Sequence, residues 1–483
     1  MKLLIVGVDG MPPEILFGNL SEFPNMKKLC MSGAYGDYDA YTYGYGSRDN
    51  WLSLYTGLTP QQHGVIGNTY SDTKRKPRRE DYEDKSPFWD KLNEKDISVG
   101  MWNGLVTTPS KNIKGYMISG EPNFEIDGAE DPLADVNPVF CEEDKDLKKY
   151  IIGEIDRPPM PKSPEEFGYT WEEILEDYSL ADKILKDDYF IECVDYLEGE
   201  LEFYKNNIIN MQKNNPVDIL FFYTAIVDFI AHFQMHDQTD EVMKKSLKLI
   251  DQFIGEVLDE LAPEKIIVMS DHGLKSLASF FPNTSIEIQK EAFGWKDKSV
   301  WLKNGQIATR ARNQAFLTGI HSLKGSFIIA GEGIKKDKIG EMRTVDFYPT
   351  LLEIFDIEIP KDRQGFVLDI FSNKEIINKD KLLTKDKIKR ENIAIIQNIE
   401  VPEFNRVINE VFLDNRFANI TVFSEEKYKN IFLDNPRVEE VKLMKDFKLN
   451  FKEFQDYDKL FIAYRNKTTG EFKYLELKND LKY

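Results

Sequence analysis

Residues 47–68, SRDNWLSLYTGLTPQQHGVIGN, decide how the rest of the chain is organised. They predict an amphipathic helix that begins at Ser47, where a hydroxyl side chain commonly caps the first turn. Thr56-Gly57 should end the helix, because glycine tolerates the positive φ of a helix C-terminus. Most serines at such a position only cap, so this stretch alone leaves a chemical role for Ser47 open.

Apolar strands on both sides of this helix predict the architecture. Residues 3–8 (LLIVGV) suit a strand that is buried on both faces. An amphipathic helical pattern at 243–261 separates two later strands. Further short apolar runs repeat the strand character at 97–102, 217–223, 265–269 and 326–330. We therefore expect an α/β fold with a mainly parallel sheet sandwiched by helices, as in alkaline phosphatase-like proteins.

Changes in composition predict three regions. Residues 1–120 and 217–371 should form one catalytic domain. Residues 121–216 are acidic and proline-rich before a helical pattern begins, and we read them as an inserted cap or lid, or else as a structural embellishment. Residues 372–483 should form a small C-terminal α+β accessory region, with a hairpin of Leu460–Tyr464 and Phe472–Leu477. That region could serve assembly, for example in a homo-oligomer.

The bulk composition excludes several classes of protein. The 483 residues carry a formal charge of −20, which argues against stable binding of nucleic-acid duplexes. Three scattered cysteines are too few for a disulfide framework. No stretch approaches the roughly 18 apolar residues of a membrane span, and MKLLIVGVDG lacks the features of a signal peptide. We expect a cytoplasmic protein that does not associate with membranes.

Acid and imidazole side chains gather after the predicted strands. Asp9 ends the first strand, and open α/β sheets bind ligands at such carboxyl ends. Asp228 and His232 lie four residues apart and share one face of a helix. Any single Asp–His pair is more often part of a turn than of a metal site. The order of the full set is stronger evidence, since these are ligands that suit zinc, or else manganese or iron: Asp9, Asp228, His232, Asp271, His272 and His321.

This order of motifs resembles the alkaline phosphatase superfamily and, within it, the type I phosphodiesterase/nucleotide pyrophosphatase family. The resemblance covers about residues 1–110 and 217–371. It rests on VGVDG, on the stretch from Ser47 to Asn68, and on VDFIAH, SDHG, GIHSLKGSFIIAG, VDFYPTLLEIFDIEIP and GFVL.

The resemblance implies two divalent metal ions, which we expect to be Zn²⁺, with Mn²⁺ as the alternative. Ser47 would be the nucleophile that forms a covalent phosphoseryl intermediate. Asn68 would contact a non-bridging phosphoryl oxygen, and His63 would support the fold nearby. One ion would be held by Asp228, His232 and His321, and the other by Asp9, Asp271, His272 and the Ser47 oxygen.

The chain departs from the family pattern at several positions. Ser47 stands where phosphodiesterases usually have threonine, Asp49 replaces a common proline, and Ala231 replaces a glycine. Arg48 could touch a phosphate or face solvent, and His236 matches no family position. SRDNW lacks the proline and arginine of a sulfatase motif. Residues 121–132 offer no Lys-x-Arg contact of the monoesterase type, which favours diesters.

These observations predict hydrolysis of phosphodiester or pyrophosphate bonds in small nucleotide-type substrates. Tyr41, Tyr43, Tyr45 and Trp51 could stack a base, or could serve the core or a loop. The alternatives are a phosphomonoesterase or phosphomutase of the same superfamily, and a non-catalytic nucleotide-binding module.

Overall fold

The computed structural model describes most of the chain. The described residues are 1–41, 46–67, 76–119, 145–153, 164–185, 188–235, 241–279, 281–293, 299–302, 307–311, 315–384, 387, 390–415, 418–444, 454–465 and 472–477. Asn68, His236, Tyr43 and Tyr45 lie outside these ranges, as does the segment 121–132.

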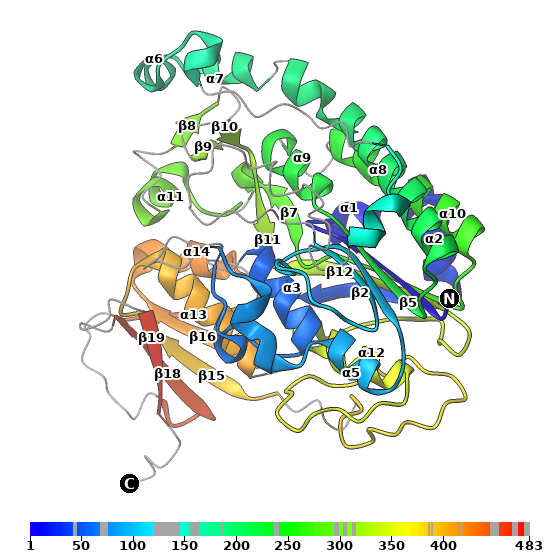
Figure 1. Cartoon of the computed structure of the whole chain (residues 1–483). Helices are drawn as coiled ribbons and strands as arrows, with labels where there is room; N and C mark the ends of the chain where they lie inside the picture. Colours follow the sequence, from blue (N-terminus) through cyan, green and yellow to red (C-terminus); the bar gives the residue numbers. More distant parts are fainter. Residues whose placement is uncertain are drawn as a thin grey trace.

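A nine-stranded sheet forms the centre of the molecule, in the order β13-β2-β12-β6-β1-β5-β3-β4 with β14 paired to β2 (Figure 1). Strand β12 runs antiparallel to both of its neighbours, whereas the other pairings are parallel. The expected mainly parallel sheet is therefore confirmed. The strands are β1 (Leu3–Val8), β2 (Ala34–Asp39), β3 (Val99–Gly104), β4 (Gly115–Ser119), β5 (Ile219–Thr224), β6 (Lys265–Met269), β12 (Lys324–Gly331), β13 (Asp337–Lys338) and β14 (Met342–Arg343).

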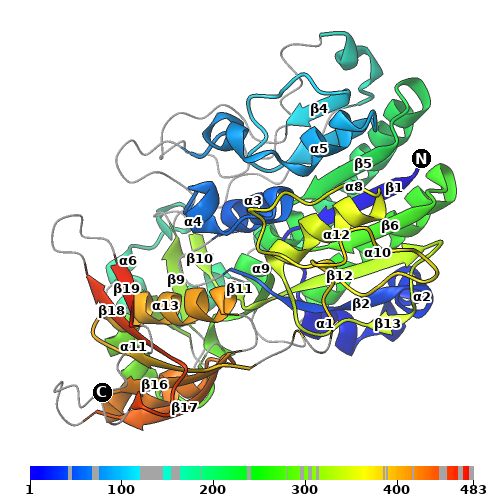
Figure 2. The same ribbon diagram turned by 90° about the horizontal axis from the view of Figure 1, so that it is seen from below.

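Helices cover both faces of this sheet, because successive side chains of a buried strand point to opposite sides. In β1, Leu4 and Val6 belong to one apolar core, and Leu3 and Ile5 belong to the other. The first core includes α1 (Pro13–Gly18), α2 (Pro24–Ser32), α8 (Asp188–Asn214), α9 (Ile226–Gln234) and α10 (Glu241–Leu261). The second includes α3 (Ser47–Thr56), α5 (Phe88–Glu94) and α12 (Phe347–Ile354), as Figure 2 shows from below.

The tyrosine- and glycine-rich tract after α2 begins with strand β2. This strand pairs with β12 along its length, and its side chains are buried or half-buried. This pairing joins residues almost 300 positions apart in the chain, so local composition could not reveal it.

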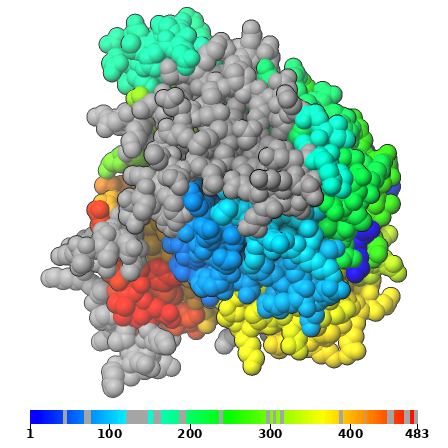
Figure 3. All heavy atoms as spheres, viewed as in Figure 1, coloured from blue at the N-terminus to red at the C-terminus, as the bar shows by residue number. Residues whose placement is uncertain are grey.

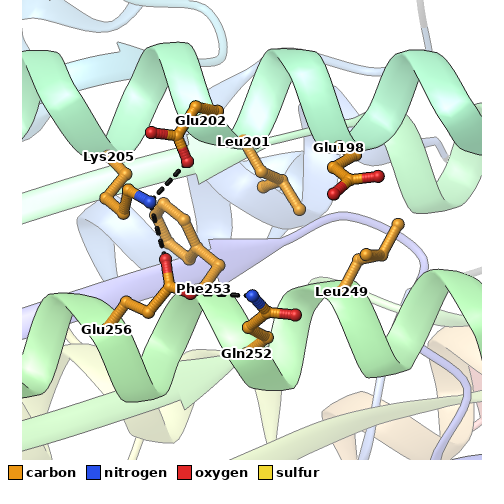
Figure 4. Close-up of a pocket in the computed structure, with 8 residues that line it drawn as sticks. All are labelled: Glu198, Leu201, Glu202, Lys205, Leu249, Gln252, Phe253 and Glu256. Carbon is orange, nitrogen blue, oxygen red and sulfur yellow. Dashed lines mark hydrogen bonds and ion pairs between the residues drawn. The ribbon is translucent and has the colours of Figure 1, made fainter.

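Part of the expected insertion belongs to the main helical layer. Helix α8 packs on the sheet, where the ring of Tyr204 lies 5.0 Å from that of Phe222. Lys205 of α8 also bridges Glu202 and Glu256 at the seam with α10 (Figure 4). The role of 121–216 as a cap stays a prediction. Its other described helices include α6 (Trp171–Glu176) and α7 (Ser179–Ile184).

Smaller sheets extend from the carboxyl end of the main sheet. Strands β7 (Gly273–Ser276) and β11 (Gly319–Ser322) pair antiparallel. A three-stranded sheet contains β8 (Ser299–Trp301), β9 (Ile307–Ala311) and β10 (Ala315–Leu317), with α11 (Ile286–Phe293) between β7 and β8 in the chain. The pairing of β7 with β11 matters for the site, because it brings His321 opposite Leu274.

The C-terminal region contains a sheet of its own, in the order β17-β16-β15-β18-β19. Its strands are parallel except for the final hairpin of β18 (Lys459–Arg465) and β19 (Phe472–Leu477), which confirms the expected hairpin. Strands β15 (Asn392–Ile396), β16 (Asn419–Ser424) and β17 (Val438–Leu443) alternate with α13 (Val401–Asp414) and α14 (Lys429–Leu433).

This region lies against the main sheet, and the boundary expected at residue 371 stays a prediction. The guanidinium of Arg437 donates to the carbonyl oxygens of Ala40 and Leu323, at 3.1 and 3.2 Å. In the space-filling view the C-terminal strands, in red, border on the blue segment that contains α3 (Figure 3). Among the described residues, no helix has the length and apolar character that crossing a membrane requires.

Candidate active site

The candidate site lies where three adjacent parallel strands end. Strand β1 pairs with β5 on one side and with β6 on the other. Asp9 follows β1 directly, and its N–H donates to the carbonyl oxygen of Thr224 at 2.9 Å. Asp228 lies in the first turn of α9, after β5, and Asp271 comes two residues after β6. Because the carboxyl ends of adjacent parallel strands lie at one edge of the sheet, these three aspartates lie near one another, as expected.

Three side chains form what we call the inner cluster: Asp9, Asp271 and His272. Their potential ligand atoms all lie within 4.8 Å of one another. The Nε2 atom of His272 is 3.5 Å from Asp9 Oδ1 and 3.2 Å from Asp271 Oδ2. These side chains are almost completely buried, with at most 1% of their surface exposed.

Three more side chains form the outer cluster: Asp228, His232 and His321. Their ligand atoms also lie within 4.8 Å of one another. His232 Nε2 is 3.2 Å from His321 Nε2 and 3.5 Å from Asp228 Oδ2. These side chains are 18–22% exposed, so the outer cluster faces solvent while the inner one does not.

The backbone fixes which histidine nitrogen faces each cluster. His232 Nδ1 lies 2.9 Å from the carbonyl oxygen of Gly319, and His272 Nδ1 lies 3.1 Å from that of Gly273. A carbonyl oxygen only accepts, so Nδ1 carries the proton and Nε2 presents its lone pair to the cluster. The rings of His272 and His321 stack with their centroids 3.7 Å apart, which places the two clusters side by side.

Gly10 fits between the clusters because it has no side chain. Its φ is +69°, and a Cβ atom there would lie 2.8 Å from Asp228 Oδ1. Its N–H donates to Asp271 Oδ1 at 3.3 Å. Both the left-handed backbone and the close approach therefore require glycine at this position.

The electrostatics of the site suit cations. Burial, together with the charge of nearby Asp9, raises the pKa values of Asp228 and Asp271 well above the ordinary range. Burial also lowers the pKa values of the three imidazoles, so they are neutral donors. Asp228 Oδ1 and Asp271 Oδ2 are buried and have no hydrogen-bond partner in the described part of the chain. Unpartnered carboxylate oxygens beside neutral imidazoles are a donor set that fits divalent metal ions.

Ser47 lies directly against the inner cluster. It is the first residue of α3 and Gly46 is the N-cap, so its side chain does not cap the helix. Instead its Oγ lies 3.2 Å from Asp9 Oδ1 and 3.1 Å from His272 Nε2. The structure thus brings together seven of the eight predicted site residues, and the eighth, Asn68, lies outside the described residues.

Comparison with known proteins gives the family of the chain. The model of the family described as type I phosphodiesterase / nucleotide pyrophosphatase matches residues 3–324. The chain belongs to this family. Both clusters and Ser47 fall within the matched residues. The family comprises hydrolases that act on phosphodiester and pyrophosphate bonds.

Individual family members match over shorter stretches. Bis(5'-adenosyl)-triphosphatase ENPP4 of Bos taurus is 31% identical over 136 residues, which cover 26% of this chain and 30% of the relative. The protein of the same name from Pongo abelii is 27% identical over 129 residues, 24% of this chain and 28% of the relative. The chain therefore spans less than a third of the length of these curated relatives.

Solved structures of similar proteins include ectonucleotide pyrophosphatase / phosphodiesterase 5 from human and mouse. Human ectonucleotide pyrophosphatase / phosphodiesterase 5 has a TM-score of 0.42 at 14% identity, over 76% of this chain and 97% of that one. The murine protein, as an inactive variant in complex with AMP, has a TM-score of 0.40 at 14% identity, over 74% and 96% of the two chains.

Two aromatic side chains orient Asp9. Asp9 Oδ2 accepts from Trp51 Nε1 at 3.0 Å and from the Tyr223 hydroxyl at 2.8 Å. Trp51 is fully buried, so it is a core residue and cannot stack on a nucleotide base. Tyr41 is buried as well. Sequence reasoning missed Tyr223, because its partner Asp9 lies 214 positions away in the chain.

Asp49, which stands where the family commonly has proline, is fully buried. Its Oδ2 accepts from the Gly46 N–H and its Oδ1 from the Gly67 N–H, both at 2.7 Å. Burial raises the pKa of Asp49 to about 7, and these two N–H groups oppose that rise. The side chain of its neighbour Asn50 also contacts this segment, since its Nδ2 donates to the carbonyl oxygens of Tyr41 and Gly46.

His63 and Arg48, the other two residues considered in the sequence analysis, are both buried. The Val65 N–H donates to His63 Nδ1 at 3.2 Å, and His63 Nε2 lies 3.2 Å from Ser53 Oγ. Burial lowers the pKa of His63 to about 3, so this histidine is neutral and part of the fold. Arg48 is 7% exposed, so it is not the surface guanidinium that we considered.

Proposed function

We propose that this protein hydrolyses phosphodiester or pyrophosphate bonds in nucleotide-type substrates, with two divalent metal ions and a covalent intermediate on Ser47. The observation that carries the proposal is the position of Ser47 Oγ, within 3.2 Å of Asp9 and His272 and beside two sets of metal-ligand side chains. Membership of the type I phosphodiesterase family supports the same reaction class.

The inner cluster with the Ser47 oxygen would hold one ion, and the outer cluster would hold the other. Bound there, divalent ions would neutralise the phosphoryl oxygens and favour ionisation of the attacking oxygen. Aspartate and imidazole donors favour Zn²⁺, and Mn²⁺ is the alternative. Asp9 is already oriented by Trp51 and Tyr223, so its Oδ1 remains directed at the reacting oxygen.

The bond changes balance as follows. The Ser47 hydroxyl releases its proton to solvent and Oγ attacks phosphorus. An O–P bond forms, and the bond to the leaving alcohol or nucleotide breaks as its oxygen takes up a proton from solvent. Water then cleaves the phosphoseryl ester, which restores the Ser47 hydroxyl and releases a nucleoside monophosphate. N–H groups of the first turn of α3 lack intrahelical acceptors and favour the phosphoryl oxygens. Asn68 is proposed to contact a non-bridging oxygen.

A nucleotide-type substrate is supported by the relatives, which are named for cleavage of bis(5'-adenosyl) triphosphate. A phosphomonoesterase or phosphomutase remains the second candidate, because serine is the nucleophile of alkaline phosphatases. Residues 121–132 contain no Lys-x-Arg pair for the extra charge of a monoester, which favours diesters.

Substrate preference tests the proposal. Protein loaded with Zn²⁺ or Mn²⁺ is assayed with bis- and mono-nitrophenyl phosphate, then with dinucleoside polyphosphates, NAD-like pyrophosphates and cyclic nucleotides. We expect kcat/KM for the diester to exceed that for the monoester by at least about ten-fold. The opposite ratio would establish the monoesterase. Tight nucleotide binding without turnover, in protein that contains about two metal ions per chain, would establish a binding module.

A further inference from the structure

Two segments that approach the proposed phosphoryl site are held together by one carboxylate. The first is Gly46–Ser47, at the start of α3. The second ends at Gly67, which precedes Asn68 in the chain. Asp49 accepts from the backbone N–H of Gly46 with one oxygen and from that of Gly67 with the other, each at 2.7 Å.

We propose that Asp49 is a positioning residue, which fixes the Ser47 segment relative to the loop that leads to Asn68. The inference rests on the proposed function, in which Ser47 attacks and Asn68 contacts the phosphoryl group. Asp49 touches neither the substrate nor the metal ligands in this account. It acts through the backbone of Gly46 and Gly67, and a misplacement of about 1 Å at such a site lowers the rate by about 100-fold.

A carboxylate suits this position because both partners are donors. Hydrogen bonds from N–H to an ionised acceptor are stronger than neutral ones, and a buried carboxylate needs them to offset its desolvation. Arg48 and Arg406, the latter on α13, also contribute favourable charge at Asp49. An asparagine would offer one acceptor and one donor, so it would oppose an N–H with an N–H.

The same observation explains how the chain manages without the family's proline. Proline at this point of a first helical turn fixes φ but accepts nothing through its side chain. Instead of restricting its own φ, Asp49 forms a hydrogen bond with Gly67, which lies 18 residues further along the chain. Asn50 adds a second link, because its side chain donates to the carbonyl oxygens of both Tyr41 and Gly46.

Asp49→Asn, compared with Asp251→Asn, tests the proposal. Asp251 is the matched control, because it is also buried and accepts two backbone N–H groups, from Met26 at 2.7 Å and Asn25 at 3.1 Å. It joins α10 to α2 and has no contact with either cluster. We expect both variants to lower Tm, but only Asp49→Asn to lower kcat, by at least about ten-fold, with little change in metal content.

A double-mutant cycle of Asp49→Asn with Asn68→Ala measures whether their losses in kcat are additive. A role of Asp49 in stability alone would leave the two losses additive. If Asp49 acts through the loop before Asn68, the losses in kcat will be less than additive. Additive losses, or a kcat loss no larger than that of Asp251→Asn, would overturn the proposal. Asp49→Ser, which keeps one acceptor, serves the same comparison if Asp49→Asn does not fold.

Amide hydrogen exchange separates this inference from the proposed function. We expect Asp49→Asn to lose protection at Gly46 and Gly67, while Asp251→Asn loses it at Asn25 and Met26. Unchanged protection at Gly67 would overturn the link, even in an active enzyme. Wild-type protein without turnover would instead refute the proposed function, and the exchange experiment would still report on Asp49.

Discussion

The inner and outer clusters offer the same kinds of ligand atom in different surroundings. The inner one is at most 1% exposed, and Trp51, Tyr223 and Gly10 fix its two carboxylates. The outer one is 18–22% exposed, and the backbone carbonyl of Gly319 orients His232. The difference indicates that protein contacts position the inner cluster on their own, whereas the outer cluster is accessible to solvent.

The origin of this difference lies in the elements that carry the ligands. The inner ligands follow β1 and β6, two adjacent strands in the middle of the main sheet. The outer ligands come from α9 and from β11, which belongs to a separate two-stranded sheet. Strand ends in a central sheet are covered by both helical layers, whereas the two-stranded sheet of β7 and β11 extends beyond the carboxyl end of the main sheet.

The largest effect is expected from Ser47→Ala, which removes the oxygen between Asp9 and His272. We predict a loss in kcat/KM of about 1,000-fold or more for a diester, because no other nucleophile occupies that position. Metal analysis should still find an ion at the outer cluster, which does not contact Ser47. Ser47→Thr is the control and should remain active, since threonine is the usual residue of the family. Full turnover by Ser47→Ala would refute the nucleophile assignment.

Removing one histidine from each cluster should separate the two positions. We predict that His272→Ala and His232→Ala each retain about one metal ion per chain, rather than two, and lose activity by about 100-fold or more. The ion that His232→Ala retains should exchange slowly with chelator, because the inner cluster is buried. Metal content and chelator kinetics measure both. Equal exchange rates in the two variants would contradict the contrast between the clusters.

A smaller effect is expected from Tyr223→Phe, which removes one of the two donors to Asp9 Oδ2. We predict a loss of about 10- to 100-fold in affinity for the inner ion, as for other residues that orient metal ligands. Tyr204→Phe is the matched control, because Tyr204, on α8, is also buried and its hydroxyl accepts from Asn103 Nδ2 instead of contacting Asp9. Competition with a metal-sensitive dye measures the affinities. The same loss in both variants would show that Tyr223 acts only on stability.

Much of the fold and the site was predictable because short-range patterns determine it. The apolar run 265–269 matches β6 residue for residue, and the spacing of Asp228 and His232 does place both on one face of α9. The clusters follow from the rule that parallel strands present their carboxyl ends at one edge. These features depend on short apolar runs and on their order along the chain, which can be read directly from the sequence.

The remaining features depend on contacts between distant residues. Tyr223 and Asp9 are 214 positions apart, so neither local pattern indicates their hydrogen bond. The parallel C-terminal strands were missed for the same reason, since their partners are set by tertiary packing of a lysine-rich segment. Asp49 was noticed only as a departure from proline, because its link to Gly67 requires the loop between them to be in place.

Anomalous diffraction from crystals of the metal-loaded protein would locate the ions. We predict two peaks about 4 Å apart, one among Asp9, Asp271, His272 and the Ser47 oxygen, and the other among Asp228, His232 and His321. Peaks at neither cluster, or a single ion that leaves Ser47 without a metal contact, would contradict this prediction.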